Sequence, residues 1–226
     1  MTAARHGASL GAQAERLGSG GEHPGAFGRR RPVLAVLGAY AALGGAAAVI
    51  AVALGRNPLA YDGWLGMRGP AAVLSSLGSG VCIGALTIAA TRAMVRRAQW
   101  ARALHEALRP AVHGAGDGAL VAVAVASALG EELLFRGLLV PLLGVVLPAV
   151  LFGVLHQIRG RARWGWMAWA ALMGLLFGVV FAATGSLAGP IAAHALINAA
   201  NLRFLRDTDP APRPRALGGL LRRGPE

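Results

Sequence analysis

The chain has 226 residues, of which 55% are hydrophobic and only 14% are charged, and its mean hydropathy is +0.55. A soluble domain would carry close to a quarter charged residues, so this composition excludes an ordinary soluble enzyme and indicates an integral membrane protein. The net charge is +12, and all basic residues are arginines that cluster at the ends of apolar segments. This placement indicates membrane orientation and contact with the lipid bilayer, and predicts no nucleic-acid partner.

The first half of the chain predicts a tail, two spanning helices and a surface helix. Residues 1–32 are polar and glycine-rich, which is typical of a disordered tail. The apolar runs from Val33 to Leu54 and from about Pro70 to Ala90 are long enough to cross a bilayer. Between residues 91 and 114, arginines alternate with apolar side chains at helical spacing. This pattern predicts an amphipathic helix on the membrane surface, which completes an N-terminal unit over residues 33–114.

The second half of the chain predicts the core of the protein. Four more apolar segments lie near residues 120–143, 145–158, 164–184 and 187–205. The fold class predicted is an all-α polytopic membrane bundle of about six transmembrane helices, with the amphipathic helix before the third. Residues 115–206 form its core, and the proline- and arginine-rich residues 207–226 predict a second disordered tail.

The arginines also predict the orientation of the bundle. If the N-terminus is cytoplasmic, 19 arginines fall in the two tails and in the segments 91–114 and 159–163, with Arg203 and Arg206 counted in the second tail, and only Arg56 and Arg68 lie outside. Cytoplasmic loops of membrane proteins carry the excess of arginine. We therefore expect both termini in the cytoplasm, and the all-arginine usage and short loops favour a bacterial plasma membrane.

Three charges interrupt the apolar run AVAVASALGEELLFRGLLVPLLGVV, namely Glu131, Glu132 and Arg136. Each costs roughly 2.5–3.5 kcal/mol at the centre of a membrane helix, so such residues usually pair and carry function. Glu132 and Arg136 are four residues apart and predict an ion pair. Glu131 is rotated away and stays available as a general base toward water. The alternative is a buried ion-pair network that only fixes helix packing.

Two later segments carry further polar residues in an apolar setting. His156 ends LFGVLHQ, and His194 and Asn198 share a helix face in HALINAAN. Counting at 1.5 Å per residue from turns near Gly144 and Gly185 places Glu131, His156 and Asn198 at one depth, with His194 a turn shallower. The sequence thus predicts one polar cavity that opens toward the cytoplasm.

At these residues the chain resembles the type II CAAX prenyl endopeptidase family of intramembrane proteases, also called CPBP or ABI. GEELLFRGLL fits the family motif EExxxR, LFGVLHQ fits FxxxH and HALINAAN fits HxxxN, in the family's order. The resemblance covers about residues 115–205. It implies an intramembrane endopeptidase that processes protein or peptide substrates near the cytoplasmic membrane face, with lipid-modified CAAX proteins as the implied class.

The resemblance also implies roles for the motif residues. Glu131 is expected to activate water with His156, Glu132 and Arg136 to shape and neutralise the site, and His194 and Asn198 to form the opposite wall as ligand or oxyanion stabiliser. Family members are commonly described as metalloproteases, which would make Glu131, His156 and His194 ligands of a divalent metal such as zinc. A metal-free, glutamate-activated water is the alternative, since the spacing is not a standard zinc signature.

Two other functions are compatible with the sequence. A non-proteolytic membrane scaffold of the bacteriocin-immunity type would use the polar residues only to hold the bundle together. A small transporter would use the carboxylates as a proton relay, but the chain has no internal repeat. The sequence predicts no particular oligomeric state.

Overall fold

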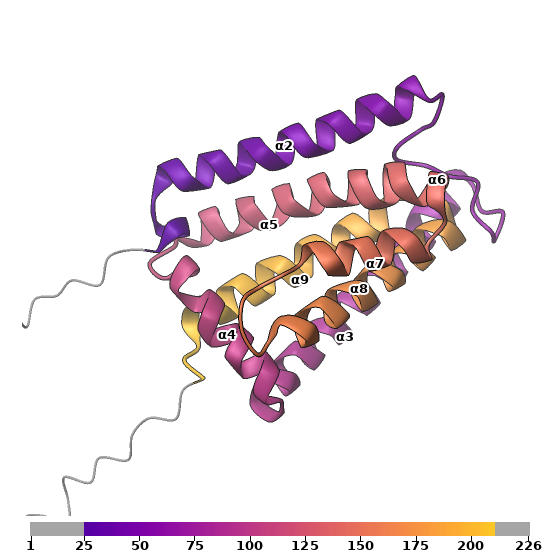
Figure 1. The fold of residues 1–226 in the computed structure, drawn as a ribbon. Helices are drawn as coiled ribbons and strands as arrows, with labels where there is room; N and C mark the ends of the chain where they lie inside the picture. The colour runs from indigo at the N-terminus through magenta and orange to yellow at the C-terminus, as the bar shows by residue number, and fades with distance from the viewer. Residues whose placement is uncertain (1–24, 211–226) are drawn as a thin grey trace, which may run out of the picture.

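The computed structural model describes residues 25–210, and within this range every regular element is a helix (Figure 1). The predicted all-α bundle is therefore confirmed. In chain order the elements are η1 (Ala26–Gly28), α2 (Arg30–Ala53), α3 (Gly69–Arg97), α4 (Gln99–Val112), α5 (Asp117–Glu132), the π-helix η2 (Leu133–Leu139), α6 (Val140–Leu143), α7 (Val146–Leu155), α8 (Arg163–Thr184) and α9 (Ala188–Asp207).

All six predicted apolar segments form helices, but they differ in length. Four helical segments of the described range are long and apolar enough to cross a membrane: α2, α3, the continuous unit Asp117–Leu143 and α8. α9 has 20 residues, which is long enough for a crossing, but it is less apolar because it carries polar side chains. α7 has only 10 residues and rises ~15 Å, about half the thickness of a ~30 Å core.

The boundary between the second helix and the amphipathic helix lies later than predicted. α3 continues past Ala90 to Arg97, because arginine stems can pack on apolar surface while their charged heads reach water. Ala98 then adopts an extended conformation and ends the helix. The amphipathic helix is therefore α4, over Gln99–Val112, and it packs across the ends of α3, α8 and α9.

The two predicted tails fall mostly outside the described residues, which exclude 1–24 and 211–226. At the N-terminal boundary, η1 and the first turn of α2 lie within the segment 1–32 that we predict as a tail. Phe27 of η1 packs against Val112 and Leu120. At the other boundary α9 ends at Asp207.

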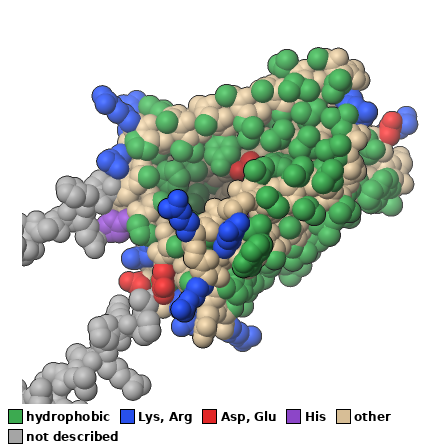
Figure 2. Space-filling view, in the orientation of Figure 1, with side chains coloured by type: hydrophobic (Ala, Val, Ile, Leu, Met, Phe, Trp, Pro, Cys, Tyr) green, Lys and Arg blue, Asp and Glu red, His purple; other side chains and the backbone are tan. Residues whose placement is uncertain are grey.

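α9 lies at the centre of the bundle, between α3 and α5, while α2 covers α5 and α7 lies along α8 (Figure 1). Small residues allow these close approaches. A Cβ atom at Gly80 of α3 would clash with the Gly189 carbonyl oxygen of α9, and one at Gly174 of α8 would lie 3.1 Å from Cα of Ala149. The exterior along the helices is largely hydrophobic, and the arginines gather near the end where the described termini lie (Figure 2).

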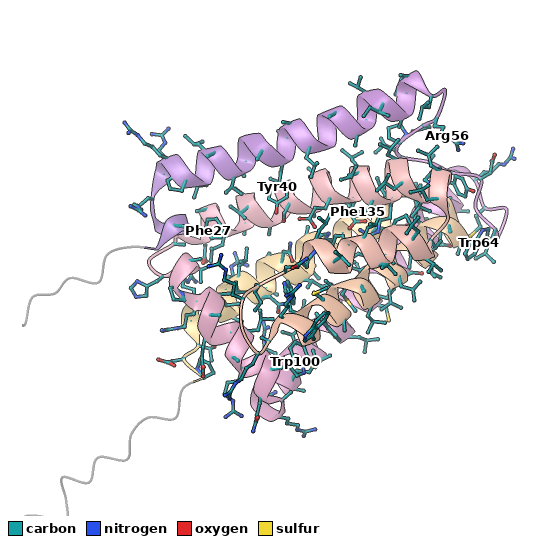
Figure 3. All side chains as sticks on the ribbon, in the orientation of Figure 1. Phe27, Tyr40, Arg56, Trp64, Trp100 and Phe135 are labelled. Carbon is teal, nitrogen blue, oxygen red and sulfur yellow. The ribbon has the colours of Figure 1, made fainter. Side chains whose placement is uncertain are left out.

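The opposite end of the bundle is closed by the loop between α2 and α3. Its backbone pairs with the turn between α8 and α9: Tyr61 N–H donates to the Gly185 carbonyl at 2.8 Å, and Leu187 N–H donates to Leu59 at 3.1 Å. Trp64 lies at this end, far from Phe27 and Trp100 at the other (Figure 3). The loop therefore covers the end of the bundle away from the described termini.

Candidate active site

The charged trio lies where α5 passes into the π-helix η2. Glu132 and Arg136 are almost completely buried, with 0% and 1% of their side chains exposed. Arg136 Nη1 donates to Glu132 Oε1 at 2.9 Å, and Nη2 donates to the Gly174 carbonyl at 3.0 Å. The guanidinium also lies 4.8 Å from the centre of the Phe152 ring. The predicted ion pair is confirmed, and it fixes the second glutamate of the motif rather than the first.

His194 connects the two adjacent carboxylates. Its Nδ1 lies 2.8 Å from Glu132 Oε1, and its Nε2 lies 3.7 Å from Glu131 Oε2. Because Glu132 Oε1 already accepts a hydrogen bond from Arg136, this oxygen is an acceptor, so His194 Nδ1 donates to it. In the neutral ring, Nε2 then presents its lone pair toward Glu131.

His156 faces the same carboxylate oxygen from the other side. α7 ends at Leu155, so His156 lies at the end of a half-length helix, where its side chain is partly buried. Its Nδ1 lies 2.7 Å from the Phe152 carbonyl oxygen and its Nε2 lies 3.9 Å from Glu131 Oε2. A carbonyl only accepts, so Nδ1 donates and Nε2 is left to face Glu131.

Glu131 Oε2 is buried and, among the described residues, has no hydrogen-bond partner. Two imidazole Nε2 atoms face this oxygen from beyond hydrogen-bond distance. A buried oxygen of this kind usually has a partner, and a bound water typically makes two to four hydrogen bonds. One oxygen and two ring nitrogens around a common space could accept both hydrogens of such a water.

Asn198 lies one turn away from this centre and reaches a different residue of α5. Its Nδ2 donates to Ser127 Oγ at 3.0 Å, and Ser127 Oγ donates in turn to the Ala124 carbonyl at 3.1 Å. The predicted depth order is therefore wrong, because His194 rather than Asn198 is level with Glu131. The predicted depth of Glu131 assumed an α-helical rise for every residue between Glu131 and the turn at Gly144. The segment η2 between them is a π-helix, which rises less per residue, so Glu131 lies closer to that turn than predicted.

Tyr40 of α2 is a site residue that we did not predict. It interacts with Glu131 through its side chain, and it lies between α2 and α5 (Figure 3). Gly130 makes room for it, since a Cβ atom there would lie 2.7 Å from the Tyr40 carbonyl oxygen. One signal was available: Tyr40 is the only residue between Val33 and Leu54 with a hydrogen-bonding side chain.

These side chains line one cavity of about 290 Å³. Glu131, His156, His194 and Asn198 all contribute to it, and its remaining walls are mainly apolar and aromatic. It extends toward α4 and the end of α9, where Leu108 and Leu205 line it. A hollow with an acidic side chain beside it is visible in the otherwise hydrophobic face of Figure 2. The polar centre is thus reached through an apolar passage.

The predicted metal ligands Glu131, His156 and His194 converge, but not in the arrangement of a metal site. Two zinc ligands that each lie roughly 2.0–2.2 Å from the metal are about 3.4 Å apart. Here His194 Nε2 lies 3.7 Å and His156 Nε2 lies 3.9 Å from Glu131 Oε2. Over the described part of the chain, no group of three His, Cys, Asp or Glu side chains fits a metal ion. Metal binding stays a prediction.

The fold and the site together define a helical membrane protein with a buried polar centre. The family model described as type II CAAX prenyl endopeptidase Rce1-like matches residues 118–200, a segment that contains all three motifs. The resemblance indicated by the three motifs is therefore confirmed over these residues, and it indicates a protease of the CAAX type at the level of the family. No curated protein and no solved structure matches the chain.

Proposed function

We propose that the protein is an intramembrane endopeptidase in which Glu131 and the two histidines activate water to hydrolyse a peptide bond. The observation that carries this proposal is the buried Glu131 oxygen without a partner, faced by His194 Nε2 at 3.7 Å and His156 Nε2 at 3.9 Å. A water held by these atoms has a base beside it and an apolar cavity around it.

The reaction needs one proton transfer in each direction. Glu131 takes a proton from the water while the water oxygen bonds to the carbonyl carbon of the substrate, and the carbonyl oxygen becomes an oxyanion. The carbon–nitrogen bond then breaks as Glu131 returns the proton to the departing amine. Asn198 has a second amide N–H beyond the one that Ser127 accepts, and this N–H is available to the oxyanion.

Glu132 and Arg136 act on this reaction through His194. The carboxylate of Glu132 accepts from His194 Nδ1 and so selects the ring form whose Nε2 faces Glu131. Arg136 offsets the charge of Glu132 inside the bundle. Both residues are positioning residues in this scheme, because neither lines the cavity.

The proposed substrate is a protein or peptide whose reactive segment lies near the cytoplasmic face of a bacterial plasma membrane, with both termini of the chain on that side. The arginine bias supports the orientation, and the closed end at the α2–α3 loop supports access from the opposite end or from the side. The apolar lining of the cavity supports a lipid-modified or hydrophobic peptide.

Cleavage of two quenched peptides by the full chain in liposomes tests this proposal. One peptide ends in a farnesylated cysteine followed by three residues, and the other lacks the farnesyl group. We expect cleavage by the wild-type chain and none by Glu131→Ala or His156→Ala, with Glu106→Gln as the control because Glu106 is exposed on α4. Normal cleavage by both site variants would contradict the proposal. If the protein is instead a non-proteolytic scaffold, the Glu131→Gln variant should keep the cellular phenotype of the wild type.

A further inference from the structure

A second pocket lies away from the catalytic centre, at the end of the bundle where the described termini lie. It is a groove of about 540 Å³ between the last turns of α3, the start of α4 and the segment after α9. We refer to it as the arginine groove. Its lining residues are Arg92, Val95, Arg96, Arg102, Phe204, Thr208, Asp209 and Pro210.

The three arginines of the groove come from two helices that meet at a break. Arg92 and Arg96 are one turn apart and share a face of α3. The extended residue Ala98 then turns the chain, so that Arg102 of α4 lines the same groove. Arginines from two helices can approach a phosphate group from two sides, and each planar guanidinium group can donate two parallel hydrogen bonds to it.

Two of the guanidinium groups are held in place by the protein. Arg92 donates to Asn201 Oδ1 at 2.7 Å and to the Ala200 carbonyl at 2.9 Å, and it lies 4.0 Å over the Phe204 ring. Arg102 donates to the Arg96 carbonyl at 3.2 Å. This fixation lowers the entropy lost when an anion binds.

The charge of the groove remains positive. Asp209 is the acidic residue in the lining of the groove. Its Oδ2 lies 3.7 Å from Nη1 of Arg109, which is not a lining residue. Three arginines and one aspartate line the groove, so positive charge exceeds negative charge in its lining, and Arg96 is exposed. Val95, Phe204 and Pro210 add apolar surface beside these charges, so the groove suits an anionic group attached to an apolar chain.

We infer that the arginine groove binds the phosphate headgroup of an anionic phospholipid. The groove lies where the apolar part of α3 ends and the amphipathic helix α4 begins, which is the level at which headgroups meet a membrane protein. The site is distinct from the catalytic cavity and needs no protease activity. Leu108, further along α4, lines that cavity, so the two sites share this helix.

Native mass spectrometry of the full chain in detergent, titrated with phosphatidylglycerol or phosphatidylcholine, tests this inference. We expect tighter binding of phosphatidylglycerol, and a loss of about 30-fold in Arg96→Gln/Arg102→Gln if each arginine contributes as juxtamembrane arginines commonly do. The control is Arg97→Gln/Arg159→Gln, which removes the same charge from exposed arginines outside the groove. This control should bind phosphatidylglycerol as the wild type does.

Three results would overturn the inference. They are equal affinity for the two lipids, equal losses in both double variants, and displacement of phosphatidylglycerol by inorganic phosphate at similar concentration, which would indicate a site for free phosphate. If Arg96→Gln/Arg102→Gln fails to fold, Arg96→Lys/Arg102→Lys replaces it. Lysine keeps the charge but not the planar fork, so we then expect a smaller but measurable loss relative to the control pair.

Discussion

His194 donates from Nδ1 to Glu132 Oε1 at 2.8 Å, and the same oxygen accepts from Arg136 at 2.9 Å. One carboxylate oxygen therefore holds both a histidine of the site and the buried arginine. The neighbouring Glu131 has no such support from a cation. The two adjacent glutamates of the motif thus differ in environment, and they should respond differently to substitution.

Glu132→Gln should destabilise the protein. Removal of one partner of a buried ion pair leaves the other charge uncompensated and typically costs about 3–5 kcal/mol. Thermal unfolding in detergent measures the loss. The double variant Glu132→Gln/Arg136→Met removes both charges and should recover most of the stability, because a neutral replacement of a buried pair is often tolerated. A double variant as unstable as the single would show that the ion pair is not the cause.

Glu131→Gln should behave in the opposite way. Both glutamates have a buried Oε2 atom without a hydrogen-bond partner among the described residues, but Arg136 is paired with Glu132, and an amide nitrogen at Glu131 Oε2 can donate to a facing imidazole. We expect unchanged or higher stability, by up to about 1 kcal/mol, together with cleavage reduced by roughly 10²–10⁴-fold as for loss of a general base. Parallel unfolding and cleavage assays separate the two effects, and a loss of stability as large as that of Glu132→Gln would contradict this assignment.

Tyr40→Phe should lower kcat about tenfold with little change in KM or in stability. The substitution keeps the ring beside Gly130 and removes only the hydroxyl that interacts with Glu131, and a tenfold loss corresponds to about 1.4 kcal/mol of transition-state stabilisation. Tyr61→Phe is the control, since Tyr61 packs on Phe181 and lies in the loop at the closed end. Equal effects of both substitutions on kcat would mean that Tyr40 has no specific role.

The sequence alone predicted the features that depend on charge or on uninterrupted hydrophobic runs. Glu132 and Arg136 could be paired because an unpaired charge is costly in an apolar helix and their spacing places them on one face. Gly144 could be placed as the turn, and it adopts a positive φ of 75° there. The helical segments followed from uninterrupted apolar runs.

The missed features depend on packing between distant segments. The π-helix η2 is not encoded in a periodic pattern, so the axial shift that makes His194 level with Glu131 could not be counted. In the sequence Ser127 is indistinguishable from other small residues of membrane helices, and only the packing of α9 on α5 makes it the partner of Asn198. Similarly, the short α7 was predicted as a longer helix, because its apolar run continues toward a histidine that in fact ends it.

Gly130→Ala should separate α2 from α5. The added Cβ would lie 2.7 Å from the Tyr40 carbonyl oxygen and 3.2 Å from its ring, so the helices must move apart at a cost of about 1–3 kcal/mol. Gly45→Ala is the matched control, because a Cβ atom there meets nothing within 4 Å. We expect this control to be neutral or slightly stabilising through helix propensity. Unfolding curves of the two variants that coincide would contradict the close approach at Gly130.

Cleavage should persist after the purified protein is dialysed against a chelator. The two imidazole Nε2 atoms lie 3.7 and 3.9 Å from Glu131 Oε2, wider than the roughly 3.4 Å expected between ligands of one zinc ion. A water between these atoms would instead donate one hydrogen to Glu131, which removes it, and the other to one of the two Nε2 atoms. Elemental analysis before and after dialysis provides the control for metal removal. Activity that is lost with the metal and restored by added zinc would identify Glu131, His156 and His194 as ligands and contradict the metal-free reaction.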